Sequence, residues 1–213
     1  NTTIAIGTAE DNNYNFTPLN TSTFEVGQKA LTVTADNQSK TYGDSFTFDG
    51  TEFTTSGLVS SDAVSSATIT SAGAAATATV DGSPYAINIS SASGTGLANY
   101  DISYVAGSFA VGKKALAVTA VADDITYGDV APTVTVEYSG FVNGEDATVL
   151  DDTGFDLGTD YSQFDAVDTY NTTIAIGTAE DNNYNFTPLN TSTFEVGQKA
   201  LTVTADDLSK FCG

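Results

Sequence analysis

The chain has 213 residues, and its 27 acidic residues outnumber six lysines to give a net charge of −21 at pH 7. Such a charge repels phosphate backbones and anionic lipid headgroups, so we expect neither nucleic-acid binding nor peripheral membrane association. Histidine is absent and Cys212 is the single cysteine, which leaves no material for the usual catalytic triads or zinc sites. We therefore expect a protein that is not an enzyme.

A long exact repeat sets the organisation of the chain. Residues 1–36 return letter for letter as residues 171–206, and a finer period of 85 residues relates VGQKALTVTA from Val26, VGKKALAVTA from Val111 and VGQKALTVTA from Val196. Repeats of this kind are typical of tandem arrays of structural modules. A protein built around one active site has no need of them.

The period divides the chain into two alternating types of module. We predict four parts: residues 1–27 as the C-terminal part of a second-type module, 28–112 as a complete first-type module, 113–197 as a complete second-type module, and 198–213 as the first strand of another first-type module. No segment supplies the front of the module that ends at residue 27. We therefore expect a fragment of a longer protein, or a chain completed by its neighbours.

Within each module, side chains alternate between apolar and polar, which is typical of half-buried strands. Residues 30–35 place Leu31, Val33 and Ala35 on one face. The further predicted strands of the first-type module are 45–48, 67–70, 75–80, 85–90 and 100–111. Those of the second-type module are 116–121, 133–138, 172–176, 184–186 and 193–196.

Helix signals are confined to two matching places. Residues 60–64 and 143–150 each follow a glycine and a hydrophobic residue and carry Asn or Ser ahead of acids, which favours a short N-capped turn. The predicted fold class is therefore all-β. We expect mainly antiparallel small β-sandwich or β-grasp-like modules in tandem, with at most one short helical turn per module.

The order of motifs resembles a known repeat family. Each module has TYGD near its start, then a Gly-hydrophobe pair followed by an acid, a tyrosine that opens a strand, Asn-Tyr, and finally VGKK or VGQK before the next module. This resembles the MBG-type tandem repeat of large bacterial surface or secreted adhesins. The resemblance implies β-rich domains in tandem and an extracellular location at the bacterial cell surface. It transfers no functional residue, and we do not carry over mucin binding.

Two sets of repeated residues have alternative interpretations. Tyr42 and Tyr127 precede a glycine in TYGD, and core or corner packing is the first interpretation, with ligand stacking as the alternative. The lysines at the module boundaries (Lys29, Lys113, Lys114 and Lys199) either pair with acids such as Glu25, Glu195 or Asp36, or supply a Lys–Asn isopeptide bond.

The acidic loops are the candidate metal site. Carboxylate oxygens are the ligands that Ca²⁺ prefers, and the calcium candidates are Glu10, Asp11, Asp123, Asp124, Asp151, Asp152, Glu180 and Asp181. No EF-hand loop or nonapeptide calcium repeat is present, so a site would be assembled from separate loops. Solvated acidic loops without a metal are the alternative. No other cofactor is expected.

Two functions follow from the sequence. The first is a structural spacer or stalk repeat in a long extracellular adhesin or biofilm matrix fibre, whose partners are neighbouring identical modules and, through lateral pairing, adjacent fibres. The alternative is a weak glycan- or glycoprotein-binding module that gains strength by multivalency. No stretch reaches the roughly 20 apolar residues of a membrane span, so no membrane insertion is expected within this window.

Overall fold

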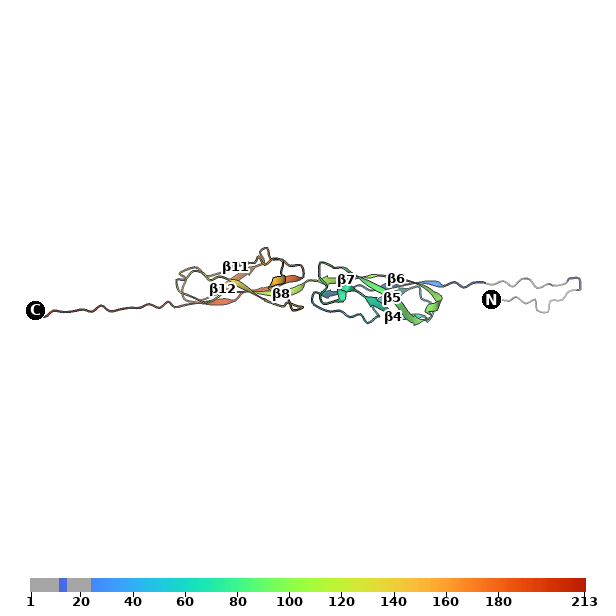
Figure 1. The fold of residues 1–213 in the computed structure, drawn as a ribbon, viewed down its shortest axis with the longest axis horizontal. Helices are drawn as coiled ribbons and strands as arrows, with labels where there is room; N and C mark the ends of the chain where they lie inside the picture. The colour runs from blue at the N-terminus through green and yellow to red at the C-terminus, as the bar shows by residue number, and fades with distance from the viewer. Residues whose placement is uncertain (1–11, 15–23) are drawn as a thin grey trace. The chain divides into compact units, whose positions relative to one another are not determined.

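The computed structural model describes residues 12–14 and 24–213, and Figure 1 draws its fold as a ribbon. The chain divides into two compact units. The first unit comprises the described residues up to Asp36, together with Phe48–Ile69 and Asn88–Ala106. The second comprises Asn37–Thr47, Thr70–Ile87 and Gly107–Gly213. The units do not follow the sequence repeat, because the second contains part of the first-type module together with the whole of the second-type module. The predicted module boundaries themselves stay predictions.

Seven strands make up the first-type module, in two sheets. The strands are β1 (Lys29–Ala35), β2 (Gln38–Thr41), β3 (Phe53–Ser56), β4 (Ala63–Thr70), β5 (Tyr85–Thr95), β6 (Tyr100–Val105) and β7 (Gly107–Gly112). Their order is β3-β1-β6 in one sheet and β2-β7-β5-β4 in the other. Two single 3₁₀ turns, η1 (Ala72–Ala74) and η2 (Leu97–Asn99), lie in the connections, so this module has one helical turn more than the sequence predicted.

The second-type module repeats this arrangement strand for strand. Its strands are β8 (Lys114–Val121), β9 (Ile125–Thr126), β10 (Thr135–Ser139), β11 (Asp156–Thr159), β12 (Thr169–Ala175), β13 (Tyr184–Asn190) and β14 (Thr193–Gly197). The sheet orders are β10-β8-β13 and β11-β12-β14-β9, so β8 to β14 correspond to β1 to β7. The all-β expectation is confirmed.

Each module also contains two parallel pairings that the alternation pattern did not predict. Strand β1 pairs antiparallel with β3 and parallel with β6, and β8 does the same with β10 and β13. The short strands β2 and β9 pair parallel with the last strand of their module, β7 and β14. The first segment of each module is therefore joined to its last segment.

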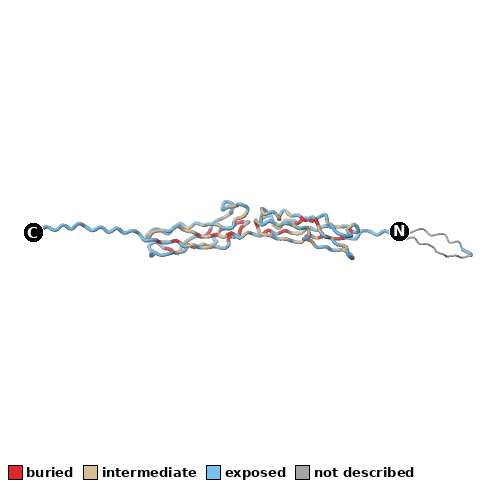
Figure 2. The backbone as a smooth tube through the Cα atoms, turned by 90° about the horizontal axis from the view of Figure 1, so that it is seen from below, coloured by how far each residue is buried: buried red, intermediate tan, exposed pale blue. Residues whose placement is uncertain are grey.

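The buried side chains follow the predicted alternation where the strands are long. Leu31, Val33 and Ala35 are buried on β1, and their counterparts on β8 are the buried Leu116, Val118 and Ala120. Figure 2 colours the backbone by burial and shows buried residues in both modules. In the second unit Tyr161, Phe194 and Val196 form a further apolar cluster. Alternation of this kind is what buries one face of a strand while the other stays in water.

Several predicted elements are wrong at the short strands and turns. Residues 45–48 and 75–80 form no strand, whereas β2, β3, β9 and β11 were not predicted. The helical turn predicted within 143–150 is confirmed as η3 (Ala147–Val149), with Asp146 accepting a hydrogen bond from the Thr148 amide. The turn predicted at 60–64 is not helical, because Ser60 has φ 54° and β4 begins at Ala63.

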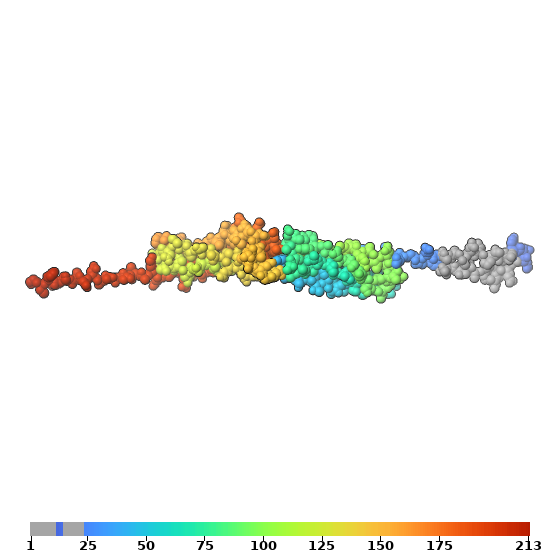
Figure 3. Space-filling model, viewed as in Figure 1, coloured from blue at the N-terminus to red at the C-terminus, as the bar shows by residue number. Residues whose placement is uncertain are grey.

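Residues 198–213 form no strand. They are exposed, and Figure 3 shows the C-terminal end of the chain as an extended segment. Lys199–Ala205 nevertheless has the same sequence as β1. The strand at 29–35 is paired on both sides, with β3 and β6, and these pairings distinguish it from its exposed copy. In the described part of the chain, no helix is long and apolar enough to span a membrane.

Candidate functional site

The candidate site is the junction where the second-type module meets the end of the first, and it lies within the second unit. One side is the tyrosine turn, Thr41–Asp44. The Asp44 amide donates to the Thr41 carbonyl at 3.1 Å, and Gly43 has φ +86°. A positive φ at the third residue is what a type II turn requires and what glycine adopts without strain. The Tyr42 amide donates to the Gly112 carbonyl at 2.8 Å, which holds the turn beside the end of β7.

The other side is the acceptor pair, Tyr184 and Glu145. The Tyr184 hydroxyl accepts a hydrogen bond from the Val142 amide at 3.1 Å and donates to Glu145 Oε2. Asn143 and Gly144 both have positive φ in the turn between Val142 and Glu145, and the Glu145 amide closes it on the Val142 carbonyl at 3.0 Å. The carboxylate is therefore held at a fixed place beside the phenol ring.

Tyr42 completes this arrangement from the neighbouring module. Its hydroxyl donates to Glu145 Oε1 at 2.5 Å, so the two phenols bind the two oxygens of one carboxylate. The Tyr42 and Tyr184 rings pack edge to face, with centroids 5.6 Å apart, and Phe141 packs in the same way on Tyr184 at 5.4 Å. Tyr42 is only 4% exposed. Hydrogen bonds to a charged acceptor are stronger than neutral ones, and edge-to-face aromatic pairs add to them.

Close packing and polar contacts surround this centre. A Cβ atom built on Gly43 would lie 2.4 Å from Val142 Cγ2, so the backbone of the turn rests directly on the valine. The Val80 amide donates to Asn183 Oδ1 at 3.0 Å. Lys114 Nζ lies 3.7 Å from Asp44 Oδ1, a partly exposed pair of the kind that contributes about 0 to 1 kcal/mol.

The electrostatics of the junction favour neutral tyrosines. Burial raises the pKa of the Tyr184 phenol well above its ordinary value, and the bond to the Glu145 carboxylate raises it further. The pKa of Tyr42 is raised by the same two causes, in the same order. The phenolate forms would bring like charges together in a poorly hydrated place, so the geometry holds both hydroxyls as donors.

The repeated tyrosines and lysines behave differently at their different positions. Tyr42 is buried as the packing interpretation predicted, whereas Tyr127, its counterpart in the second-type module, is 40% exposed. Lys114 pairs with Asp44 rather than with the acids proposed from sequence, and Lys113 Nζ donates to the Asp181 carbonyl at 2.6 Å.

The structure brings some of the calcium candidates together and separates others. An isolated bridge pairs Asp152 with Glu180, and Asp181, which is 5% exposed, accepts from the amides of Asn183, Tyr184 and Asp151. Asp124 accepts from the Glu195 amide at 2.7 Å. The carboxylates of Asp181 and Asp124 thus bind backbone amides.

The remaining calcium candidates are Asp123, Asp151, Glu10 and Asp11. Asp123 is exposed next to Asp124, Asp151 accepts from the Asn182 amide, and Glu10 and Asp11 lie outside the described residues. Among residues 12–14 and 24–213, no group of three or more acidic or cysteine side chains is arranged to hold a metal ion. Calcium binding stays a prediction.

Sequence reasoning did not identify Glu145 as a junction residue. Tyr42 and Glu145 are 103 positions apart, and no local pattern links them. The available signal was the repeat itself: Val142, Glu145 and Tyr184 correspond to Val59, Asp62 and Tyr100, which have the same spacing to within a residue. The carboxylate at this place in both modules pointed to a common structural role.

The fold and the junction together define a class of protein, a tandem array of small all-β modules joined end to start without an intervening linker. Residues 31–110 and 116–195 each match the model of the MBG domain (YGX type). The chain therefore belongs to the MBG domain (YGX type) family, whose repeats are typical of large surface proteins. Searches of curated proteins and of solved structures returned no match.

Proposed function

We propose that the chain is a spacer segment of a large extracellular bacterial surface or matrix protein, and that its modules stack end to end to separate other parts of that protein. The observation that carries the proposal is the junction at Glu145, which binds a tyrosine from each of two successive modules. We infer that this contact restricts the movement of one module against the next. The role needs no catalytic group.

The connection between the modules supports the same function. Strand β7 ends at Gly112 and β8 begins at Lys114, so a single residue separates the two modules. A linker this short gives neighbouring modules little freedom to reorient, unlike the long Gly- and Ser-rich linkers that permit independent movement. Exact repetition of 36 residues also suits a spacer, because each contact is made only with the next module.

Small-angle scattering tests the proposal on the wild-type chain and on Glu145→Ala. The matched control is Glu137→Ala, which removes the same group from an exposed position on β10. We expect the wild type and the control to scatter as one stiff elongated particle, and Glu145→Ala to show the wider range of dimensions of a hinged one. A wild-type chain that scatters as a compact sphere would contradict the spacer function.

The same measurement in calcium and then in chelator separates the two origins of stiffness. A stiff particle in both conditions is expected from the Glu145 junction alone. A particle that becomes flexible only in chelator would assign the stiffness to calcium bound by the acidic loops. Weak glycan binding is the alternative function, and a glycan array probed with the whole chain tests it.

A further inference from the structure

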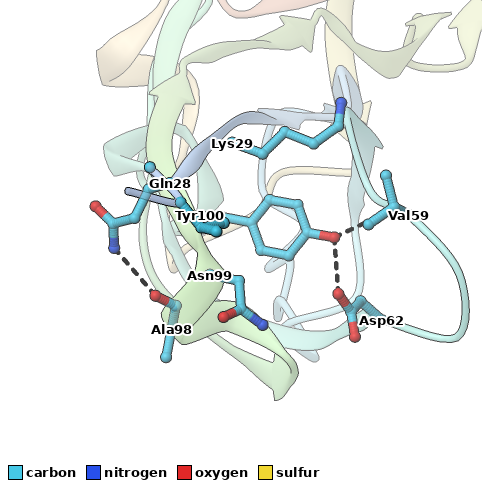
Figure 4. Close-up of a pocket in the computed structure, with 9 residues that line it drawn as sticks. Gln28, Lys29, Val59, Asp62, Ala98, Asn99 and Tyr100 are labelled. Atoms are coloured by element: carbon cyan, nitrogen blue, oxygen red, sulfur yellow. Dashed lines mark hydrogen bonds between the residues drawn. The ribbon is translucent and has the colours of Figure 1, made fainter. Parts of the chain in front are cut away.

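One pocket of the first-type module has the composition of the acceptor side of the junction. It has a volume of about 390 Å³ and is lined by residues 26–29, 59, 62 and 98–100 (Figure 4). Each of these has a counterpart at the junction already described, namely residues 111–114, 142, 145 and 182–184. Those counterparts include the acceptor pair Tyr184 and Glu145, the packing residue Val142 and the Asn183 acceptor.

The hydrogen bonds in this pocket repeat those of the acceptor pair. The Tyr100 hydroxyl accepts from the Val59 amide at 2.9 Å and donates to Asp62 Oδ2 at 2.8 Å (Figure 4). At the junction the Tyr184 hydroxyl makes the same two bonds, with Val142 and Glu145. Within the described residues no second hydroxyl donates to Asp62, whereas Glu145 also binds Tyr42. Asp62 therefore binds one phenol where Glu145 binds two.

A tyrosine turn of matching geometry is exposed on the second-type module. In Thr126–Asp129 the Asp129 amide donates to the Thr126 carbonyl at 3.0 Å, Gly128 has φ +88°, and the Tyr127 amide donates to the Gly197 carbonyl at 2.9 Å. These contacts repeat those of Tyr42 with Gly112. Tyr127 is 40% exposed, and the apolar side chains of Val130 and Phe164 are 70% and 67% exposed.

We propose that the pocket bounded by Tyr100 and Asp62 binds the Tyr127 turn of another second-type module, which forms a second kind of junction in the array. The order of modules in the repeat, as well as the chemistry of the pocket, identifies the turn that occupies it. Residues 26–29 and 196–199 are identical, so a turn held on Gly197 in one module is held on Gly27 in the repeat, beside the pocket. The Tyr127 hydroxyl then donates to the Asp62 carboxylate, as Tyr42 does to Glu145.

The two junctions differ by one methylene group. Glu145 serves the first-to-second junction and Asp62 the second-to-first junction, so the second carboxylate lies closer to its own backbone. A turn must therefore approach Asp62 more closely. The inference rests on the proposed spacer function and extends it to every junction of the array.

The test uses a two-copy chain, in which residue 206 of one copy is followed by residue 37 of the next. The join alters no sequence, because residues 1–36 and 171–206 are identical. A 3-fluorotyrosine at position 127 of the first copy reports its accessibility through the ¹⁹F signal and a soluble paramagnetic agent. Relative to the single chain, we expect exposure to fall about tenfold, from 40% toward the 4% of Tyr42.

Substitutions in the two-copy chain identify the contact. Asp62→Ala or Asp62→Asn in the second copy should return the fluorotyrosine to its exposed state, and Asp62→Ala in the first copy, which follows no tyrosine turn in that chain, should leave it buried. Circular dichroism checks that each variant is folded. A fluorotyrosine that stays exposed in the two-copy chain, or stays buried despite both second-copy variants, overturns the inference. The spacer function survives that result if scattering still shows a stiff particle.

Discussion

At the scale of the residue, glycine is the feature that permits the junction. Gly43 combines a positive φ with direct contact between its backbone and Val142. Gly128 has the same backbone conformation, but a Cβ atom placed there meets nothing closer than 3.9 Å. Substitutions at Gly43 and Gly128 therefore separate two effects on stability. One is the strain of a side chain in the turn, and the other is its overlap with Val142.

We expect Gly43→Ala to be more destabilising than Gly128→Ala. Both variants strain a left-handed position by about 1 to 2 kcal/mol, and Gly43→Ala adds an overlap with Val142 that costs about 1 to 3 kcal/mol more. Urea denaturation of the whole chain measures both changes. Equal losses in the two variants would show that the Gly43 contact with Val142 contributes nothing to stability.

Alkaline pH should weaken the junction. The raised pKa values of Tyr42 and Tyr184 mean that the folded chain holds these protons more tightly than the unfolded chain does. The resulting stability is complete below the ordinary phenol pKa of about 10 and is lost as pH rises beyond it. Denaturation between pH 8 and 11 should show a shallower loss in Tyr42→Phe than in the wild type. Parallel curves would contradict this.

At the scale of the element, the same seven residues adopt two states in one chain. Lys29–Ala35 is a paired strand and Lys199–Ala205 is exposed, although their sequences are identical. Intrinsic propensity is therefore the same in both places, and only the partners β3 and β6 differ. Strand propensity is largely a measure of such packing.

Hydrogen exchange followed by NMR should resolve the two copies. Interior amides of β1 lie in a ladder with partners on both sides, so we expect them to exchange about a thousandfold or more slowly than the matching amides of 199–205. The identical sequence removes any difference in intrinsic exchange rate. Similar protection in both segments would mean that 199–205 acquires a partner in solution.

The dependence of a strand on its partners also explains which strands could be predicted from the sequence. Long strands such as β1 and β8 were recognisable because alternation persists over seven or eight residues. Short strands such as β2 and β9 were missed, since two to four residues are too few to show a period and their pairing partner lies at the other end of the module. Residues 75–80 alternate as a strand does but form a turn after η1.

At the scale of the whole molecule, the repeating unit and the compact unit are different. The repeat made the modular organisation predictable from sequence, while the second compact unit contains the end of one module and all of the next. No sequence pattern predicted this, because contacts such as the one between Glu145 and Tyr42, which are 103 positions apart, arise only in the folded chain. Only the three-dimensional register of the two modules brings those side chains together.

The parallel pairing of the two N-terminal strands of a module with its two C-terminal strands has a consequence under tension. A pull that separates Lys29 from Gly112 draws β2 and its parallel neighbour β7 in opposite directions along their length, and it does the same to β1 and β6. All hydrogen bonds of a ladder are then loaded together instead of opening one at a time. We expect high rupture forces in single-molecule stretching of the whole chain, and Val33→Pro, which removes a ladder donor from β1, should lower them. Unchanged forces in that variant would place the load elsewhere. Both module types contain these parallel pairs, so every module of an array should resist stretching in the same way.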